Sequence, residues 1–181
     1  DMLHKQQGMR GPFLVVAPLS TIVQWQREIN MWTGMDAIIY HGNSEDREML
    51  RNYEFNYMSR KPNEGTKLQV VITTPDTCMS SDSKNSMRRE LTKIKWDCLV
   101  VDEAHRLKNY ESKVGAALRD DFDYLNCLLL TGTPLQNNTD ELWTLLNFVA
   151  RDEFSDREAF CSDFGNLKEA SQLKDLHARL K

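Results

Sequence analysis

Two adjacent acids directly after an apolar run are the residues of this sequence best suited to chemistry. Asp102 and Glu103 follow the apolar run 98–101, and Ala104 and His105 come next. An Asp at the end of a buried strand can hold the hydration shell of a Mg²⁺ ion that is bound to nucleotide phosphates. A Glu beside it is placed to orient and deprotonate the water that attacks the γ-phosphate. The pattern favours a nucleotide-hydrolysing site over a polar turn in which Asp102 only caps the following residues.

A second polar segment is expected to lie beside these acids. Thr131, Gly132 and Thr133 come directly after a further apolar run, and Gln136 follows shortly after them. A segment in this place could report the state of the nucleotide to whatever Gln136 contacts. His105 could link the two segments, because an imidazole both donates and accepts hydrogen bonds. The alternative is a tight turn in which Gly132 supplies a permissive backbone.

A third set of polar residues could hold the phosphates of a nucleic-acid strand along the same edge. The set comprises Ser20, Thr21, Thr73, Thr74, Lys108 and Asn109. Contacts of this kind fix the position of a strand without reading its base sequence. Taken singly, the four hydroxyl residues are better interpreted as helix caps, so the strand contact is a hypothesis about the whole set.

The elements that must position these residues are indicated by five apolar runs. The runs 13–17, 68–72, 98–101 and 127–130 are nearly continuous, which is typical of strands buried on both faces, and 37–40 is a weaker fifth. Segments with helical spacing separate most of the runs. This alternation predicts an α/β fold with a mainly parallel sheet and helices on both faces. Ligands bind beyond the carboxyl ends of the strands in such sheets, where all the polar segments would emerge.

The expected helices divide the chain into a lobe and an extension. They are a helix over 22–32, one opening at Asn43 or Ser44, and others capped by Ser112, Thr139 and Ser171. The polar stretches 59–67 and 79–85 are expected to be surface loops. Beyond about residue 151 only helix signals remain. We therefore expect a lobe over 1–150 and a helical extension over 151–181.

Composition excludes several classes of protein. The 181 residues carry a net charge of −4, which argues against a protein that holds nucleic acid by bulk positive charge. No stretch approaches 18 consecutive apolar residues, and the first residues lack the layout of a signal peptide, so neither a membrane protein nor a secreted one is expected. The four cysteines are too far apart for a zinc site and are expected to be reduced thiols of an intracellular protein.

One element that a nucleotide hydrolase of this design needs does not occur in the sequence. The phosphate-binding pattern Gly-x-x-x-x-Gly-Lys-Ser/Thr is found nowhere in the 181 residues. The backbone and lysine of that loop hold the β- and γ-phosphates. We therefore expect these residues alone to be inactive.

Three motifs resemble those of the SWI/SNF-like chromatin-remodelling ATPases of helicase superfamily two. They are the segments PLSTIVQW at 18–25, VDEAHRLKN at 101–109 and LTGTPLQNN at 130–138. The segments at 11–14, 40–42 and 53–55 look most like the chromodomain-helicase-DNA-binding branch. The resemblance implies the first RecA-like lobe, a three-layer α/β unit, of a two-lobed DNA-dependent ATPase. Such an enzyme uses ATP and Mg²⁺ to translocate on duplex DNA and move nucleosomes in the nucleus.

The resemblance also implies roles for individual residues. Asp102 matches the Mg²⁺-associated acid, Glu103 the water-activating acid and His105 a coupling residue. The coupling motif is matched by Thr131, Gly132 and Thr133, while the DNA-tracking segments are matched by Ser20, Thr21, Thr73, Thr74, Lys108 and Asn109. The family pattern places the phosphate-binding loop before position 1 and a second RecA-like lobe after position 181, so the chain is expected to be a fragment. The sequence departs from the pattern at Pro75, where remodellers usually carry an aromatic residue.

Two other functions are open at this point. An RNA helicase lobe also carries Asp-Glu-Ala-His, but its coupling motif usually reads Ser-Ala-Thr, and Thr131-Gly132-Thr133 argues against it. A non-catalytic binding module that has lost its phosphate loop is the second alternative. Asp102 and Glu103 argue against that alternative, because a module without catalysis has no physical need for adjacent acids at a strand end.

Overall fold

The computed structural model describes residues 11–42, 69–79, 87–109, 111–132 and 139–164. Several expectations lie outside these residues. They are the helices after Asn43 or Ser44 and after Ser171, the loop 59–67, nearly all of the loop 79–85, and the site residues Thr133 and Gln136.

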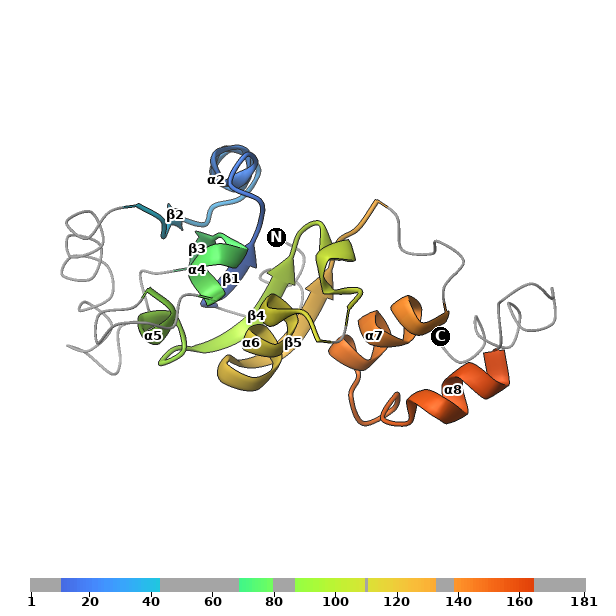
Figure 1. Ribbon diagram of the computed structural model, residues 1–181. Helices are drawn as coiled ribbons and strands as arrows, with labels where there is room; N and C mark the ends of the chain where they lie inside the picture. The colour runs from blue at the N-terminus through green and yellow to red at the C-terminus, as the bar shows by residue number, and fades with distance from the viewer. Residues whose placement is uncertain (1–10, 43–68, 80–86, 110, 133–138, 165–181) are drawn as a thin grey trace.

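Five parallel strands form one sheet at the centre of the described structure (Figure 1). They are β1 Phe13–Val16, β2 Ala37–Ile39, β3 Val70–Thr73, β4 Lys95–Val101 and β5 Asp123–Leu129. Their order is β2-β3-β1-β4-β5, and every neighbouring pair runs parallel. The predicted α/β fold is confirmed, and the carboxyl ends of all the strands lie along one edge.

Helices cover both faces of this sheet. One face carries α2 Ile22–Trp32, and the other carries α4 Pro75–Met79, α5 Met87–Leu91 and α6 Lys113–Asp121 (Figure 1). The 3₁₀ helix η3 Ala104–Leu107 follows β4, and α7 Thr139–Val149 and α8 Arg157–Phe164 complete the described helices. None of these helices is long and apolar enough to cross a membrane.

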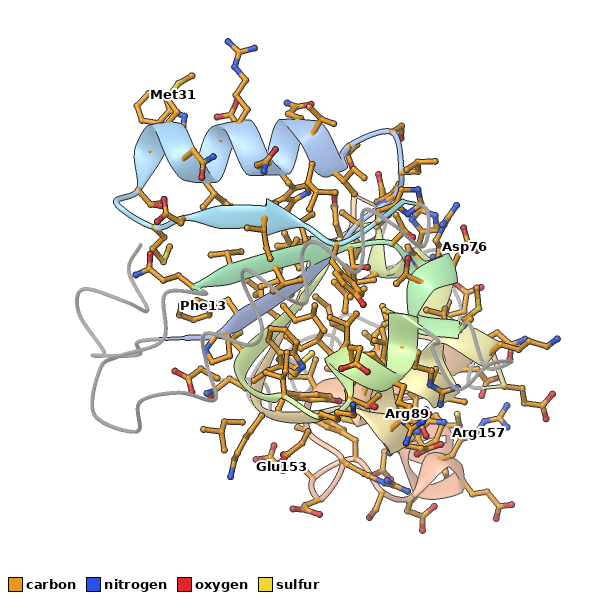
Figure 2. The ribbon with its side chains drawn as sticks, turned by 90° about the vertical axis from the view of Figure 1, so that its left-hand side faces the viewer. Phe13, Met31, Asp76, Arg89, Glu153 and Arg157 are labelled. Carbon is orange, nitrogen blue, oxygen red and sulfur yellow. The ribbon has the colours of Figure 1, made fainter. Side chains whose placement is uncertain are left out.

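Alternating side chains of β1 join the three layers. Leu14 and Val16 belong to the core shared with α4, α5 and α6, whereas Phe13 and Val15 belong to the core beneath α2. All four side chains are buried, and each such burial stabilises the fold by about 1.5–3 kcal/mol. On the outer side of α2, Met31 faces away from the sheet and is exposed (Figure 2). The continuous apolar run of β1 therefore has the two-sided burial that it predicts.

The expectation of two-sided burial is wrong for β5. This strand lies at an edge of the described sheet, where β4 is its only neighbour among the described strands. Leu125 is 62% exposed and Leu128 is 45% exposed, although Tyr124, Cys127 and Leu129 pack partly against the core. A continuous apolar run cannot distinguish a central strand from an edge strand, because both carry the same residue types.

Three short helical elements were not predicted from the spacing of apolar residues. They are α4, α5 and η3, which have only five, five and four residues. A single helical turn offers too few positions for a repeat to emerge. The start of α4 nevertheless carries a local signal, since Pro75 occupies its first position and proline is favoured there.

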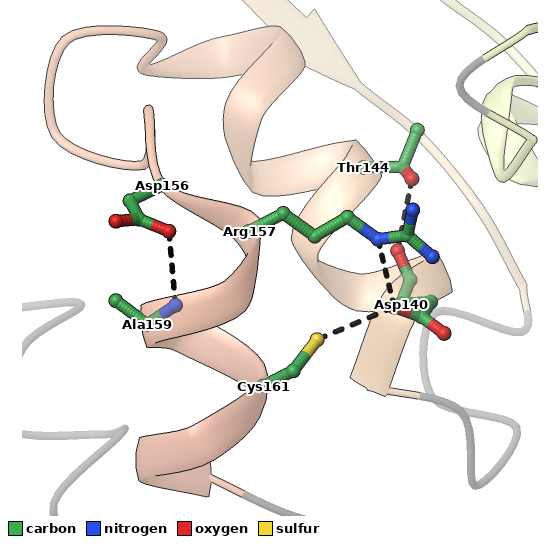
Figure 3. A network of polar contacts seen from close by, with 6 residues as sticks. All are labelled: Asp140, Thr144, Asp156, Arg157, Ala159 and Cys161. Carbon is green, nitrogen blue, oxygen red and sulfur yellow. Dashed lines mark hydrogen bonds and ion pairs between the residues drawn. The ribbon is translucent and has the colours of Figure 1, made fainter.

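Polar contacts of Asp140 and a buried, mainly aromatic cluster hold α8 against α7. The Oδ1 atom of Asp140 accepts hydrogen bonds from Arg157 Nε at 3.0 Å and from Cys161 Sγ at 3.2 Å (Figure 3). The hydrogen bond from Arg157 holds the pKa of the Asp140 carboxyl below its usual value. The two helices and the turn between them also share a buried apolar cluster of Leu142, Trp143, Phe154, Phe160 and Phe164. The expected helical segment after residue 151 is present as α8 up to residue 164.

The four thiols differ in accessibility, and this difference predicts their reactivity. Burial raises the pKa of the Cys78 thiol to about 12 and that of Cys127 to about 12. The thiolate is the reactive form, so very few of these groups are reactive at pH 8. Cys161 is half-buried at the surface of α8, and we expect a disulfide reagent at pH 8 to label it first.

Mass spectrometry of the labelled protein checks this order. A Cys161→Ser variant should lose the rapid phase, and urea should release the remaining thiols. Raising the pH should speed labelling of Cys161, because the pKa of its thiol is raised by burial and by donation to Asp140. Native labelling of Cys78 as fast as that of Cys161 would contradict the burial described here.

Candidate nucleotide site at the carboxyl edge of the sheet

Backbone hydrogen bonds bind the strand ends into one rigid edge. The amide of Asp102 donates to the carbonyl of Val16 at 2.8 Å, and the amide of Ala17 donates to that of Thr73 at 3.0 Å. On the other side of β4, the amide of Leu130 donates to the carbonyl of Val101 at 2.9 Å. The polar segments after β1, β3, β4 and β5 therefore emerge side by side, as expected from the sequence.

The Asp102 carboxylate is held by two donors from different parts of the chain. Its Oδ1 accepts a hydrogen bond from the backbone amide of Glu103 at 2.9 Å. Its Oδ2 accepts one from Nε1 of Trp25 on α2, also at 2.9 Å. Asp102 lines a cavity of about 320 Å³ together with Thr21, Gln24, Trp25 and Glu28. Each carboxylate oxygen can accept more than one hydrogen bond, so both keep acceptor capacity for a further ligand.

Glu103 adopts a backbone conformation that non-glycine residues rarely use. Its φ of 51° and ψ of 46° lie in the left-handed region, which costs a residue with a side chain about 1–2 kcal/mol. The turn places the Glu103 side chain, which is half exposed, beside His105, and the two side chains pair through Oε2 and Nδ1 at 3.0 Å. Backbone strain of this kind tends to collect at functional sites.

The turn after β4 and the segment after β5 are linked through their backbones. The amide of Ala104 donates to the carbonyl of Leu130 at 2.8 Å. His105, expected to make this link, is exposed and pairs with Glu103 instead. Thr131 is half-buried and Gly132 is exposed, while Thr133 and Gln136 lie outside the described residues. The φ of Gly132 is outside the left-handed region, so its backbone adopts no conformation that requires a glycine, and the rest of the alternative tight turn lies outside the described residues.

Ser20 and Thr21 lie at the start of α2, close to Asp102. Ser20 is exposed, and Thr21 is half-buried on the wall of the same cavity as Asp102. Thr21 holds the helix N-cap position, yet its side chain makes no cap hydrogen bond and its hydroxyl donates to the carbonyl of Pro18 at 3.0 Å. The interpretation of Thr21 as a plain side-chain cap is therefore not supported.

Thr73 and Thr74 present no hydroxyl to the surface. Both are buried, and the Thr73 hydroxyl donates to the carbonyl of Tyr40 at 2.9 Å. The Thr74 hydroxyl lies 2.9 Å from that of Thr77 and accepts a hydrogen bond from the Thr77 amide at 3.4 Å. Thr74 thus caps α4, whose first residue is Pro75. Side-chain contact with a nucleic-acid strand does not fit these two positions.

Lys108 and Asn109 line a separate polar cavity of about 630 Å³ between η3 and α7. The Lys108 ammonium pairs with Glu141 Oε2 at 3.0 Å, and the Lys108 side chain is mostly buried. Asn109 is exposed, and its Oδ1 accepts a hydrogen bond from the amide of Glu111. Asn109 is therefore the more accessible of the two to a strand passing the sheet edge.

The donor set at Asp102 suits a magnesium ion that arrives with a nucleotide. The described residues contain no group of three or more His, Cys, Asp or Glu side chains able to hold a metal. Mg²⁺ keeps several waters and is bound through one or two carboxylates plus substrate phosphates, so it needs no such cage. A single fixed carboxylate facing a cavity fits that requirement.

Trp25 is the site residue that the sequence analysis leaves out. The helical spacing of the apolar residues in α2 predicts a packing role for Trp25, and its ring does pack partly in the core beneath α2. The same spacing predicts the same role for Trp32, which is instead 72% exposed and donates to Glu28 of the same helix. Only the approach of α2 to the end of β4 reveals the indole as a partner of Asp102.

Comparison with known proteins agrees with this arrangement. Residues 1–181 match the family model described as the SNF2-related domain. The chain is 44% identical over 178 residues to chromodomain-helicase-DNA-binding protein 6 of Rattus norvegicus, covering 97% of this chain and 6% of the relative. It is 43% identical over 180 residues to chromodomain-helicase-DNA-binding protein 8 of Homo sapiens, covering 96% and 7%. Protein CHROMATIN REMODELING 5 of Arabidopsis thaliana is 41% identical over 182 residues, covering 99% and 10%.

A solved structure shares the fold. The Sulfolobus solfataricus SWI2/SNF2 ATPase core in complex with dsDNA matches with a TM-score of 0.70 and 22% identity, over 97% of this chain and 33% of that one. The expected resemblance to the chromodomain-helicase-DNA-binding branch is confirmed by these relatives, of whose length this chain spans 6 to 10%. The chain belongs to the SNF2-related domain family.

Proposed function

We propose that residues 1–150 form the first RecA-like lobe of an ATP-dependent chromatin remodeller and that 151–181 lead toward a second lobe. The full-length protein would hydrolyse ATP with Mg²⁺, translocate on duplex DNA and move nucleosomes in the nucleus. The relatives named as chromodomain-helicase-DNA-binding proteins support this function, as does the SWI2/SNF2 ATPase core that was solved with dsDNA.

One observation carries the proposal. Asp102 and Glu103 follow the end of a buried parallel strand, the Asp102 carboxylate is held by two hydrogen bonds, and Asp102 lines a cavity. This is the placement that nucleotide hydrolysis demands of an Mg²⁺-associated acid and its neighbouring base.

The roles of the site residues follow from their positions. Bound Mg²⁺ would supply positive charge against the phosphate oxygens. Asp102 would hold a water of its hydration shell, and Glu103 would accept the proton of the attacking water. The Glu103 side chain is free to turn toward the nucleotide once its pairing with His105 opens, because both are about half exposed.

Contact with DNA would involve residues at the same edge. Ser20 and Thr21, just before α2, and the exposed Asn109 would contact phosphates, with Lys108, which pairs with Glu141, as a nearby positive charge. Thr73 and Thr74 would take part through their backbone, since their hydroxyls are engaged within the lobe. Thr131, Gly132, Thr133 and Gln136 would pass the state of the nucleotide to the second lobe.

ATP hydrolysis by a full-length protein that carries this chain tests the proposal. We expect hydrolysis to be stimulated by duplex DNA and nucleosomes and to be absent from the 181 residues alone, which lack the phosphate-binding pattern. Stimulation by RNA but not by DNA would move the protein to the RNA helicase alternative. No hydrolysis with any of these partners would leave a non-catalytic binding module.

A further inference from the structure

We propose that Trp25 is a positioning residue that orients the Asp102 carboxylate for its Mg²⁺-nucleotide ligand. The proposal rests on the function proposed above, because that function makes Asp102 the metal-associated acid. It assigns to α2 a part in the nucleotide site in addition to its part in the core.

The geometry of two hydrogen bonds is the first support. Trp25 Nε1 donates to Oδ2 and the amide of Glu103 donates to Oδ1, both at 2.9 Å. One donor alone would let the carboxylate turn about its Cβ–Cγ bond. Two donors on its two oxygens fix the plane of the group, so its remaining lone pairs keep one direction.

The second support is that the donor is itself held in place. The ring of Trp25 packs partly against the apolar cluster that contains Ile22 and Ile72. Val100, two residues before Asp102 on β4, packs against the same cluster, so the ring that bonds to Asp102 is held by the core that also holds its strand. An indole has a single donor and no acceptor, and here that donor meets a carboxylate.

The chemistry of the donor is the third support. A lysine or arginine in this place would neutralise Asp102 and compete with a cation for its charge. The indole is neutral, so it orients the carboxylate and leaves its negative charge available to Mg²⁺. Outer partners of metal-associated groups commonly act in this way, and their loss costs about 10–100-fold in metal affinity or activity.

Removal of the indole N–H tests the proposal in the full-length protein. Trp25→Phe keeps an aromatic ring and deletes the donor. We expect the Mg²⁺ concentration for half-maximal ATP hydrolysis to rise about 10-fold, with a smaller change in the KM for ATP at saturating Mg²⁺. Electron paramagnetic resonance of Mn²⁺ in the presence of ADP supplies a readout independent of turnover, and Mn²⁺ affinity should fall by a similar factor.

Trp32→Phe is the matched control. Its exposed indole lies on the same helix and donates at 2.7 Å to Glu28, which lines the cavity, whereas Trp25 donates to Asp102. Trp32→Phe thus deletes an indole N–H of the same helix without touching the Asp102 carboxylate, and it should leave both metal dependences unchanged. If Trp25→Phe does not fold, β-(3-benzothienyl)alanine at position 25 replaces the N–H by sulfur while keeping the bicyclic ring.

The outcomes separate the two proposals. The positioning role would be overturned if the wild-type protein shows DNA-dependent hydrolysis while Trp25→Phe and Trp32→Phe have the same Mg²⁺ and Mn²⁺ dependences. A wild-type protein without ATP hydrolysis would overturn the proposed function, and the positioning role with it. A weaker Mn²⁺ affinity in the Trp25 variant but not in Trp32→Phe would support the positioning role.

Discussion

Replacement of Glu103 by glutamine should abolish ATP hydrolysis by the full-length protein. The amide keeps the size and the hydrogen-bonding oxygen of the side chain, but it cannot accept a proton from the attacking water. A positioned general base contributes about 10²–10⁴-fold to a rate, so kcat should fall by at least about 10²-fold. Measurement of phosphate release with saturating duplex DNA checks this prediction.

Nucleotide binding by the Glu103→Gln variant distinguishes a loss of the catalytic step from a loss of folding. Nucleotide binding should persist in Glu103→Gln, because Asp102 and the cavity beside it are unchanged. Glu153→Gln is a suitable control, since Glu153 is exposed in the turn after α7 (Figure 2). A Glu103→Gln protein that retained more than about a third of the wild-type rate would show that another group activates the water.

Replacement of Trp96 by alanine should produce the largest loss of stability from a single side chain. Trp96 is completely buried at the start of β4, and its Nε1 donates to the carbonyl of Leu91 at 3.1 Å. Truncation of a buried tryptophan leaves a cavity and costs about 3–5 kcal/mol. The carbonyl of Leu91 would also lose its indole donor. Urea unfolding followed by circular dichroism measures the change.

Trp32→Ala supplies the comparison for this measurement. The Trp32 side chain is 72% exposed, and surface substitutions usually change stability by less than about 0.5 kcal/mol. Because whole domains are stable by only about 5–15 kcal/mol, the Trp96 variant should lose a large share of its stability while the Trp32 variant keeps its own. Equal unfolding midpoints for the two variants would contradict the packing described for the core beneath α4, α5 and α6.

The sheet and its functional edge could be predicted from the sequence because their signals are local. The runs that became β1, β3 and β4 are continuous and apolar, and the polar segments follow them directly. Parallel pairing then brings the ends of these strands to one edge whatever the details of the loops. The family resemblance added roles for Asp102 and Glu103, but their positions at the end of β4 follow from the run alone.

Other features depend on contacts between residues far apart in the chain. Trp25 and Asp102 are separated by 77 positions, and no residue pattern within α2 predicts their hydrogen bond. The exposure of Leu125 and Leu128 is set by the order of strands, which apolar runs do not encode. Thr73 and Thr74 carry the residue types of a phosphate contact, yet the neighbouring Tyr40 carbonyl and Thr77 engage their hydroxyls first.

The link between the turn after β4 and the segment after β5 has a consequence for genetics. It consists of an amide and a carbonyl, at Ala104 and Leu130, and these atoms are the same in nearly every amino acid. Exchange of either side chain therefore leaves the connection in place, and a scan of alanine substitutions would miss it. Replacement of the peptide bond before residue 104 by an ester, which removes the N–H alone, would measure how much this hydrogen bond contributes to the proposed coupling of the two segments.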